Sequence, residues 1–493
     1  MTRTKKAIGI AVLLPVLVFF ALVLWPSGLP PAPDPETSRQ IRNVRIVDVV
    51  TGSISEPQTV AIRNGRIAAI GNDVQQRGVP VLDGQGSYLL PGFWDMHIHS
   101  FQLSPQLHLP LWIAGGVTSA RDMMDCPGEA DTLIACHEDK QRWNRLIANG
   151  ELASPRIAQI ASFYLERSDM APSEARRLVR AYRARGLDAI KVYNRLSHDA
   201  FLAAADEARL SQMKLVGHLP KAVALPQAIA AGQDSFEHGH VLPRHCFDKT
   251  SDWRAGRLDE TDPVALTQMI IGGFNRTECE KMTRAMAAAD AWLVPTHVTR
   301  EEDARAADPA YLADPALDYL DPLSRWAFDD DRSASRAAFP GEEGRATIRA
   351  YFDHSLRLTG LAHANGVKVL VGTDSPIGGL RFHDELQHLV HAGMGPASVL
   401  KAATLDSARF AGEDHISGSV DIGKRADLIL LRHNPLADIS NTRSIAAVIQ
   451  GGRLYDRQRL DALQQFVKDQ AHAPHNWAKL LWGFARSSVS SEL

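Results

Sequence analysis

The chain has 493 residues, of which 45% are hydrophobic and 23% are charged, and its formal net charge is −3. This is the composition of an ordinary globular protein that is long enough for one large domain and a smaller one, and it leaves the oligomeric state open. The 54 Lys and Arg are balanced by 57 Asp and Glu, so the basic excess typical of nucleic-acid-binding proteins is absent and we expect no nucleic-acid partner.

The N-terminus has the pattern of a membrane segment. Basic residues at positions 3, 5 and 6 precede 19 uncharged residues, 7–25, which as a helix would span about 28 Å, close to the hydrocarbon thickness of a bilayer. Because the positive flank stays cytoplasmic, we expect residues 1–25 to be a signal anchor, a transmembrane helix that attaches an extracytoplasmic (periplasmic) protein to the cell membrane. A cleaved signal peptide, which would release a secreted protein, is the alternative. The Pro-rich residues 26–39 are expected to be a stiff linker.

Between residues 91 and 416, short apolar runs alternate with helical patterns. Eight such runs are the signature of a (β/α)8 TIM barrel, a fold of the α/β class in which active sites lie at the C-terminal ends of the strands. The runs are LLPGFWDMHIH, GVTSARDMM, PRIAQIASF, LDAIKVY, KLVGHL, DSFEHG, AWLVPTHV and VKVLVGTD. Residues 242–344 are long for one barrel connection, so we expect an insertion with helices of its own that caps the site.

Strand patterns flank the barrel on both sides, at residues 40–90 and 417–458. The later strands cannot pair within a closed barrel, so we expect the two segments to form one small β-sandwich. Residues 459–493 are expected to be a helical tail, whose last helix presents an apolar face that packs on the protein or, as the alternative, on a membrane. That face consists of Trp477, Leu480, Leu481 and Phe484.

The four cysteines are Cys126, Cys136, Cys246 and Cys279. None forms a close CxxC pair, so a structural zinc site built on cysteines is not expected. An oxidising compartment would permit two disulfides. Four cysteines allow three pairings, of which the pairing of sequence neighbours is the simplest.

Six residues with metal-binding chemistry lie at the ends of the predicted barrel strands. In PGFWDMHIHS, His97 and His99 are two apart, so that both rings would lie on one face of a strand. Each of the six is commonplace by itself, but the ordered set indicates a metal centre. The six are His97, His99, Lys191, His218, His238 and Asp374.

Lys191 is the unusual member of this set. As an ammonium ion it would repel a metal, but after N6-carboxylation by CO2 it becomes an anionic ligand that can bridge two ions. Four neutral imidazoles, one carbamate and one carboxylate then form a site for two divalent metal ions. Zinc (Zn2+) is the expected ion, and manganese, cobalt or iron also suit the set.

The stretches that carry the resemblance to a known family are PGFWDMHIHS, DAIKVYNRLS, LVGHLP, SFEHGH, VGTDS, HDELQHLVHAGMGPASVLKAATLDSARFAG and GSVDIGKRADLILLRHNPLADI. Together they resemble the amidohydrolase superfamily, and within it the metal-dependent hydrolases related to imidazolonepropionase and Xaa-Pro dipeptidase (prolidase). The resemblance covers residues 40–458 except much of 242–344. It implies that His97, His99 and Asp374 hold one ion. It also implies that His218 and His238 hold the second and that Lys191 bridges the two.

The ions define the expected chemistry. Two divalent metals lower the pKa of a bridging water and polarise a carbonyl, so that a metal-bridging hydroxide attacks the substrate. We expect Asp374 to accept the proton and pass it to the leaving nitrogen. Tyr193, two residues past Lys191, is expected to hydrogen-bond the oxyanion or a substrate carboxylate, with a purely structural aromatic as the alternative. Further candidate substrate-binding residues are Arg195, His240 and His297.

The sequence therefore predicts a metal-dependent amidohydrolase that cleaves the carbon–nitrogen bond of a small substrate, such as a dipeptide or an N-acyl amino acid. Hydrolysis of a cyclic amide such as an imidazolone or a lactam uses the same metals and is the alternative. A single-metal deaminase is disfavoured. The single-metal members of the superfamily carry a Glu shortly after the histidine of the fifth strand, where this chain has GHLPKAV. They also lack the lysine of the fourth strand, which this chain has as Lys191. A catalytically dead, membrane-tethered binding protein would have no need of all six ligands.

Overall fold

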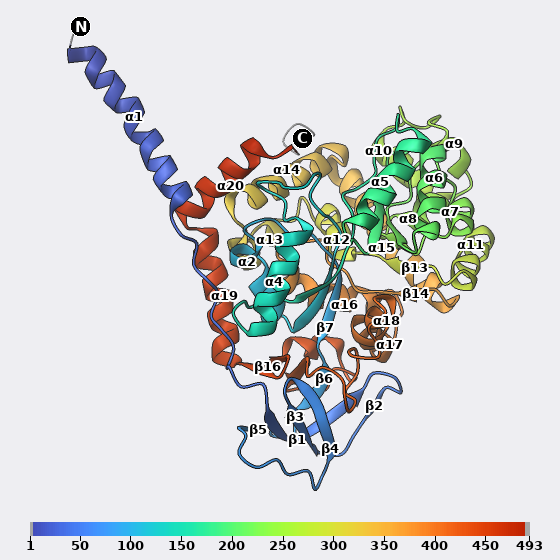
Figure 1. Cartoon of the computed structure of the whole chain (residues 1–493). Helices are drawn as coiled ribbons and strands as arrows, with labels where there is room; N and C mark the ends of the chain where they lie inside the picture. Colours follow the sequence, from blue (N-terminus) through green and yellow to red (C-terminus); the bar gives the residue numbers. More distant parts are fainter. Residues whose placement is uncertain (1–2, 489–493) are drawn as a thin grey trace.

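Eight parallel strands form the centre of the computed structural model, which describes residues 3–488, with side chains from residue 14 onward (Figure 1). Three of them pair in the order β7-β8-β9 and five in the order β10-β11-β12-β13-β14. Ala161 bridges to Ala189 in parallel, which joins the two sheets. On the other side, the amide of Met96 donates to the carbonyl of Val371 (2.8 Å) and closes the ring. The predicted TIM barrel is confirmed.

The barrel strands follow the eight apolar runs. Every residue of β7 and β8 is buried, because one face of each strand meets the barrel interior and the other meets the surrounding helices. The strands are β7 (Phe93–Ile98), β8 (Val117–Asp122), β9 (Arg156–Ile160), β10 (Ala189–Val192), β11 (Lys214–Gly217), β12 (Ser235–Glu237), β13 (Trp292–Val294) and β14 (Lys368–Val369).

Helices follow each barrel strand and cover its outer face. In α5, Ala175, Val179 and Tyr182 are buried at helical spacing, which turns one stripe of the helix towards the sheet. The helices after the first five strands are α2 (Ser104–Leu107), α3 (Leu109–Ala114), α4 (His137–Asn149), α5 (Pro172–Ala184), α6 (His198–Leu210) and α7 (Leu225–Ala231). Those after β14 are α16 (Gly378–His391), α17 (Pro396–Lys401), the π-helix η2 (Ala402–Asp406) and α18 (Ser407–Phe410).

Residues 242–344, predicted to be one insertion, contain barrel strand β13 and so belong to two successive connections. The apolar residues of β13 are buried between β12 and β14, with which they pair in parallel. The connection before it holds α8 (Val241–His245), α9 (Thr250–Arg254), α10 (Pro263–Gly272) and α11 (Arg276–Ala288). The connection after it holds α12 (His297–Ala304), α13 (Pro309–Leu312), η1 (Pro315–Tyr319), α14 (Pro322–Ala338) and α15 (Gly341–Ala364).

The abundance of Asp-Pro pairs in these connections has a local explanation. Asp262, Asp308, Asp314 and Asp321 are each the N-cap of a helix whose first residue is proline, and each side chain accepts hydrogen bonds from backbone amides of the first turn. Proline at this position loses no helical hydrogen bond, and the carboxylate satisfies amides that have no partner within the helix. The acidic residues therefore begin helices.

Strands from both ends of the chain join beside the barrel. In the described part of the chain they form a nine-stranded sheet with the order β17-β16-β15-β6-β1-β3-β4, and β2 and β5 also pair with β1. Ile41, Val60, Leu89, Leu428 and Ile449 are buried in its core. The strands are β1 (Arg39–Asp48), β2 (Ser53–Ile54), β3 (Gln58–Arg63), β4 (Arg66–Gly71), β5 (Val81–Asp83), β6 (Tyr88–Pro91), β15 (Leu428–Leu431), β16 (Ile445–Gln450) and β17 (Arg453–Asp456), with η3 (Ile439–Arg443) before β16.

The N-terminal apolar run forms α1 (Arg3–Leu24), which extends away from the rest of the protein (Figure 1). Within the residues that the structure describes, no helix is long and apolar enough to cross a membrane. Part of the described apolar surface of α1 packs on α20, where the rings of Phe20 and Trp482 lie 5.3 Å apart. Residues 1 and 2 and the side chains before Leu14, which belong to the predicted anchor, lie outside the described part.

The C-terminal tail forms α19 (Arg457–Ala471) and α20 (Pro474–Arg486). Leu480 is buried and Phe484 packs beside it in a small apolar cluster that includes Cys126 and Cys136. Trp477 and Leu481 are 38% and 58% exposed. Only part of the predicted apolar face of this helix therefore packs on the protein.

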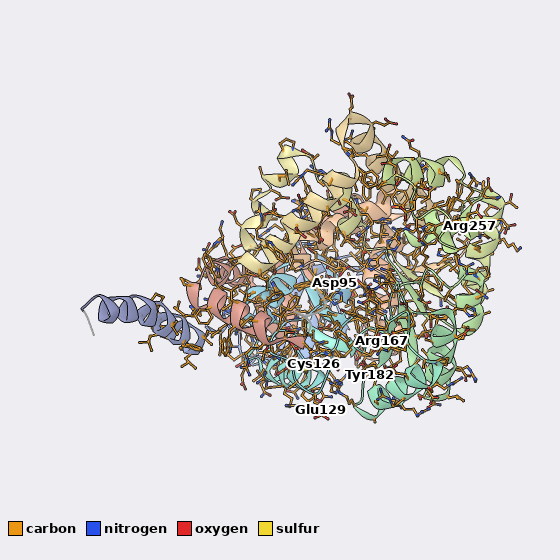
Figure 2. All side chains as sticks on the ribbon, turned by 90° about the horizontal axis from the view of Figure 1, so that it is seen from above. Asp95, Cys126, Glu129, Arg167, Tyr182 and Arg257 are labelled. Atoms are coloured by element: carbon orange, nitrogen blue, oxygen red, sulfur yellow. A yellow bond between two sulfur atoms is a disulfide. The ribbon has the colours of Figure 1, made fainter. Side chains whose placement is uncertain are left out.

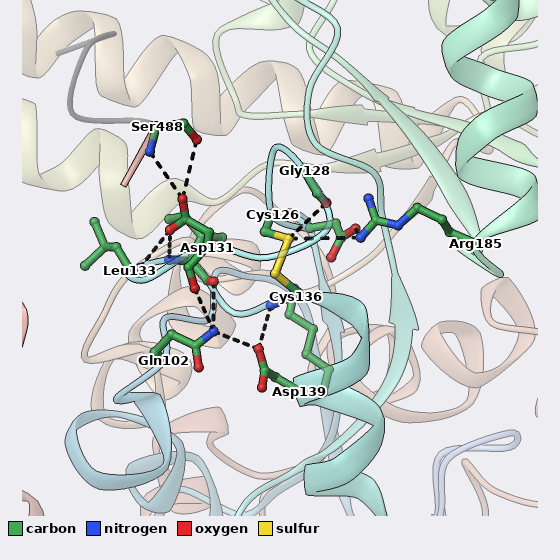
Figure 3. Close-up of a disulfide and its surroundings, with 12 residues drawn as sticks. Gln102, Cys126, Gly128, Asp131, Leu133, Cys136, Asp139, Arg185 and Ser488 are labelled. Carbon is green, nitrogen blue, oxygen red and sulfur yellow. Dashed lines mark hydrogen bonds and ion pairs between the residues drawn. A yellow bond between two sulfur atoms is a disulfide. The ribbon is translucent and has the colours of Figure 1, made fainter. Parts of the chain in front are cut away.

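Both expected disulfides are present, and no described cysteine is free. Cys126 and Cys136 close the loop after β8, where Arg185 and the carbonyl of Gly128 approach Cys126 (Figure 3). Cys246 and Cys279 join the end of α8 to α11 across 33 residues of sequence. The pairing of sequence neighbours is confirmed.

Candidate metal centre

The six predicted ligands meet at the C-terminal end of the barrel. His97 lies in β7 and Lys191 in β10, and the others lie just beyond β7, β11, β12 and β14. Close contacts connect them all, because parallel strands of a barrel end at the same face. The members of this set, called the ligand set below, are His97, His99, Lys191, His218, His238 and Asp374.

The first part of the ligand set is built around Asp374. Its Oδ1 lies 3.2 Å from Nε2 of His99 and 3.6 Å from Nε2 of His97. One ligand atom from each of the three residues lies within 4.8 Å of the others, which is a spacing that one ion can fill.

The second part is built around His238. Its Nε2 lies 2.9 Å from Nε2 of His218, and its Nδ1 lies 3.7 Å from Oδ2 of Asp374. Nζ of Lys191 lies 3.5 Å from Nε2 of His99, on the side of the first part. Asp374 thus connects the two histidine pairs, and Lys191 contacts the first of them.

The environment keeps His99, His218 and His238 in the neutral form that binds metals. Burial, with a contribution from the charge of Lys191, lowers the pKa of His99 to about 4. Burial lowers the pKa of His238 to about 3 and that of His218 well below its ordinary value. Burial alone would raise the pKa of Asp374, but the neighbouring histidines outweigh it and hold that pKa well below its ordinary value.

The ligand set fits divalent ions. Nε2 of His97 and Nδ1 of His99 are buried without a hydrogen-bond partner, although a buried imidazole nitrogen normally has one. Nitrogen ligands together with a carboxylate are a donor set suited to zinc and related metals. His97, His99 and Asp374 therefore offer a position for one ion, and His218 and His238 add nitrogen donors on the other side of Asp374.

Glu237 and Arg121 support His97 from behind, and the sequence analysis did not single them out. Oε2 of Glu237 lies 3.0 Å from Nδ1 of His97, and Arg121 donates to Oε1 of Glu237 over 2.9 Å. All three side chains are fully buried. This carboxylate fixes the ring so that Nε2 faces Asp374. The available signal was a charged residue inside each of two apolar strands, in SFEHG and GVTSARDMM.

Asp95 also supports the first part, and its side chain is fully buried. It accepts hydrogen bonds from the indole of Trp112 (2.8 Å) and the hydroxyl of Thr373 (2.6 Å), so it joins β7 to the residue before Asp374. It was visible in PGFWDMHIHS, two residues before His97.

Two further residues orient the second part. Oδ1 of Asn194 lies 2.8 Å from Nδ1 of His218, and Oγ1 of Thr296 lies 2.8 Å from Nδ1 of His238. Thr296, His238 and Asp374 all have a positive φ, between 45° and 73°, which is rare outside glycine. Strain of this kind is typical of functional sites, where the surrounding structure holds a side chain in one direction.

The remaining predicted residues differ in their placement. The ring of Tyr193 lies 3.9 Å from that of His218, and His240 stacks on His238 with ring centroids 5.6 Å apart. Arg195 pairs with Glu166 and its side chain is 75% exposed. His297 is fully buried and its Nε2 contacts the hydroxyl of Thr359. Tyr193 and His240 adjoin the ligand set, and a substrate role of His297 stays a prediction.

Comparison with known proteins agrees with this geometry. The sequence model of the Amidohydrolase family matches residues 345–455, which include Asp374. The chain thus matches the Amidohydrolase family over these residues, and its structural neighbours include prolidase-like proteins.

Among solved structures, a Xaa-Pro dipeptidase with bound methionine superposes with a TM-score of 0.60 at 19% identity, over 85% of this chain and 100% of that chain. A bottromycin amidohydrolase gives a TM-score of 0.64 at 21% identity, over 92% and 93% of the two chains. These likenesses show the fold.

Among curated proteins, an adenine deaminase from Rubrobacter xylanophilus is 24% identical over 433 residues, which cover 84% of this chain and 57% of that protein. The first two curated relatives match over shorter segments, so that the chain covers 22% and 14% of their lengths.

Proposed function

We propose that this amidohydrolase uses two divalent metal ions to hydrolyse a carbon–nitrogen bond in a small amide, such as a dipeptide or an N-acyl amino acid. The observation that carries the proposal is the convergence of the ligand set, in which Asp374 lies between two histidine pairs and Lys191 lies beside His99. The structural likeness to a Xaa-Pro dipeptidase supports a substrate with a peptide-like bond.

Two bound ions, with zinc as the expected metal, would supply a Lewis acid for the carbonyl oxygen and a water molecule that ionises near neutral pH. Asp374 is ionised and lies within reach of both histidine pairs, so it is placed to take the proton of the attacking water and deliver it to the leaving nitrogen. Burial raises the pKa of Tyr193 to about 12, which keeps its hydroxyl protonated and able to donate to the developing oxyanion.

Lys191 is proposed to be carboxylated on Nζ. Burial lowers its pKa to about 8, which increases the neutral amine at physiological pH. The neutral amine attacks CO2, a new nitrogen–carbon bond forms, and one proton is released to solvent. The cation beside His99 thereby becomes an anion, which removes the repulsion that an ammonium would exert on a metal.

An extracytoplasmic location is proposed as well. Both disulfides of the described chain would be expected in an oxidising compartment and are rare in the cytosol. Small amides outside the cytoplasm, peptides above all, are then the available substrates.

The test uses the purified full chain, loaded with zinc, and a panel of dipeptides, N-acyl amino acids, cyclic amides and adenine. We expect about two ions per chain by elemental analysis and turnover of the open-chain amides. Lys191→Ala should lose at least one ion and most activity. The matched control is Lys214→Ala, because Lys214 lies in β11 and pairs with Asp234 at the surface (3.7 Å).

Each other outcome has a defined meaning. Preferential turnover of a cyclic amide would replace the open-chain proposal with its alternative. Exclusive turnover of adenine would indicate a deaminase. Full zinc content in Lys191→Ala would refute the bridging role of Lys191.

A further inference from the structure

Two neighbouring cavities lie among the helices that follow β11, β12 and β13. The larger has a volume of about 560 Å³ and the smaller of about 400 Å³. Arg244 of α8 and Trp253 of α9 line both, so the two cavities share these side chains. The sequence analysis pointed to neither residue.

The larger cavity adjoins the second part of the ligand set. It is lined by Asn194, which contacts His218, and by His240, which stacks on His238. Within the described part of the chain, Nδ1 of His240 is buried without a hydrogen-bond partner. The smaller cavity lies next to the larger one, because both are lined by Arg244 and Trp253.

The larger cavity carries positive charge that the protein does not neutralise. Two of its cations, Arg195 and Lys221, are each paired with a carboxylate. Arg244 and Arg254 have no ion pair within the described part of the chain. Arg244 lies over the ring of Trp253, 5.8 Å from its centre, which restrains the guanidinium. An unpaired, restrained guanidinium at the wall of a cavity is suited to bind a carboxylate with two hydrogen bonds.

The smaller cavity is mainly apolar. Leu266 and Ile270 of α10 line one side, and Ile348 and Phe352 of α15 line another. A cavity of this size and lining accommodates a large apolar side chain.

We propose that Arg244 binds a carboxylate of the substrate and that the smaller cavity binds an adjacent large apolar side chain. This inference rests on the proposed hydrolysis of an open-chain amide, and it narrows the substrates to N-acyl amino acids or dipeptides with a free carboxylate and a bulky apolar residue. It replaces Arg195, which is already paired with Glu166, as the carboxylate-binding residue.

The test compares N-acetylphenylalanine with its neutral C-terminal amide on the zinc-loaded enzyme, by turnover and by calorimetric binding. We expect the acid to be preferred, and Arg244→Met to lower kcat/KM for the acid about 30-fold or more, mainly through KM, without changing that for the neutral amide. N-acetylglycine should be a poorer substrate than N-acetylphenylalanine because it leaves the apolar cavity unfilled.

Two variants control for folding and for charge. Arg244→Lys keeps the charge but not the paired hydrogen bonds, and should recover part of the preference for the acid. Arg257→Met removes a guanidinium that pairs with Asp252 near the outer edge of the molecule (Figure 2) and should change nothing. Zinc content equal to that of the wild type shows that Arg244→Met is folded.

The outcomes separate this inference from the proposed function. Equal binding and turnover of the acid and the neutral amide would overturn the role of Arg244 and leave amide hydrolysis intact. The opposite result is also informative. The acid would bind more tightly than the neutral amide, this difference would disappear in Arg244→Met, and neither compound would be hydrolysed. The carboxylate site would then stand and the proposed reaction would fail.

Discussion

Replacing Glu237 with glutamine should weaken metal binding at His97 and destabilise the fold. Glutamine keeps the shape of the side chain but removes the charge that faces Nδ1 of His97 at 3.0 Å and the guanidinium of Arg121 at 2.9 Å. Arg121 is fully buried, so it would remain charged without an anionic partner. Leaving one member of a buried ion pair alone is strongly destabilising.

The magnitude follows from the pKa of Glu237. Burial alone would raise it, but Arg121 and the hydrogen bonds from His97 and Ser235 lower it to about 2, against an ordinary value of 4.5. This difference corresponds to about 3 kcal/mol in favour of the ionised form. Because the pKa is lowered by folding, the stabilisation is complete above pH 4.5 and is lost as the pH falls towards 2. Loss of a residue that orients a metal ligand also costs about 10- to 100-fold in metal affinity.

The assay is urea unfolding of the metal-free protein at pH 7 and below pH 4.5, with equilibrium dialysis against zinc at pH 7. We expect Glu237→Gln to lose about 3 kcal/mol at pH 7 and less at the lower pH. The control is Glu56→Gln, because Glu56 is 89% exposed and faces Arg45 across 3.8 Å. Unchanged stability together with unchanged zinc affinity would refute the argument.

Three further outcomes are expected. Acetate or formate should partly restore the metal that Lys191→Ala loses, because either anion can occupy the place of the carbamate, and metal analysis measures the recovery. Failure of every short carboxylate to restore metal would count against a bridging anion. Tyr193→Phe should keep its metals and lose much of kcat/KM, because it lacks the hydroxyl that donates to the oxyanion; wild-type kinetics would leave Tyr193 a structural aromatic. The double replacement of Cys246 and Cys279 with serine should cost about 4 kcal/mol in urea unfolding, since their bridge closes a loop of 33 residues; free-thiol counting of unreduced wild-type protein should find none.

The sequence by itself determined the barrel and the order of its strands, whereas it left three disulfide pairings open and only favoured the simplest. The barrel depends on local patterns, namely apolar runs of strand length between helical segments. The same logic located the ligand set, because residues at the ends of parallel barrel strands meet at one face whatever the details of packing. His97 and His99 illustrate this best, since their spacing alone places both rings on one side of β7.

Tertiary structure alone decided what surrounds the ligands. Glu237 contacts His97 across 140 positions of sequence, and no local pattern pairs one buried carboxylate with one histidine at that distance. No local sequence pattern distinguishes Arg195 from Arg244. The packing shows that Glu166 neutralises Arg195, whereas Arg244 lies over Trp253 without a described ion pair. The spacing of apolar residues indicates which face of a helix or strand is buried, so the barrel could be predicted. The contact partner of a side chain depends on how distant elements pack, so the surroundings of the site could not.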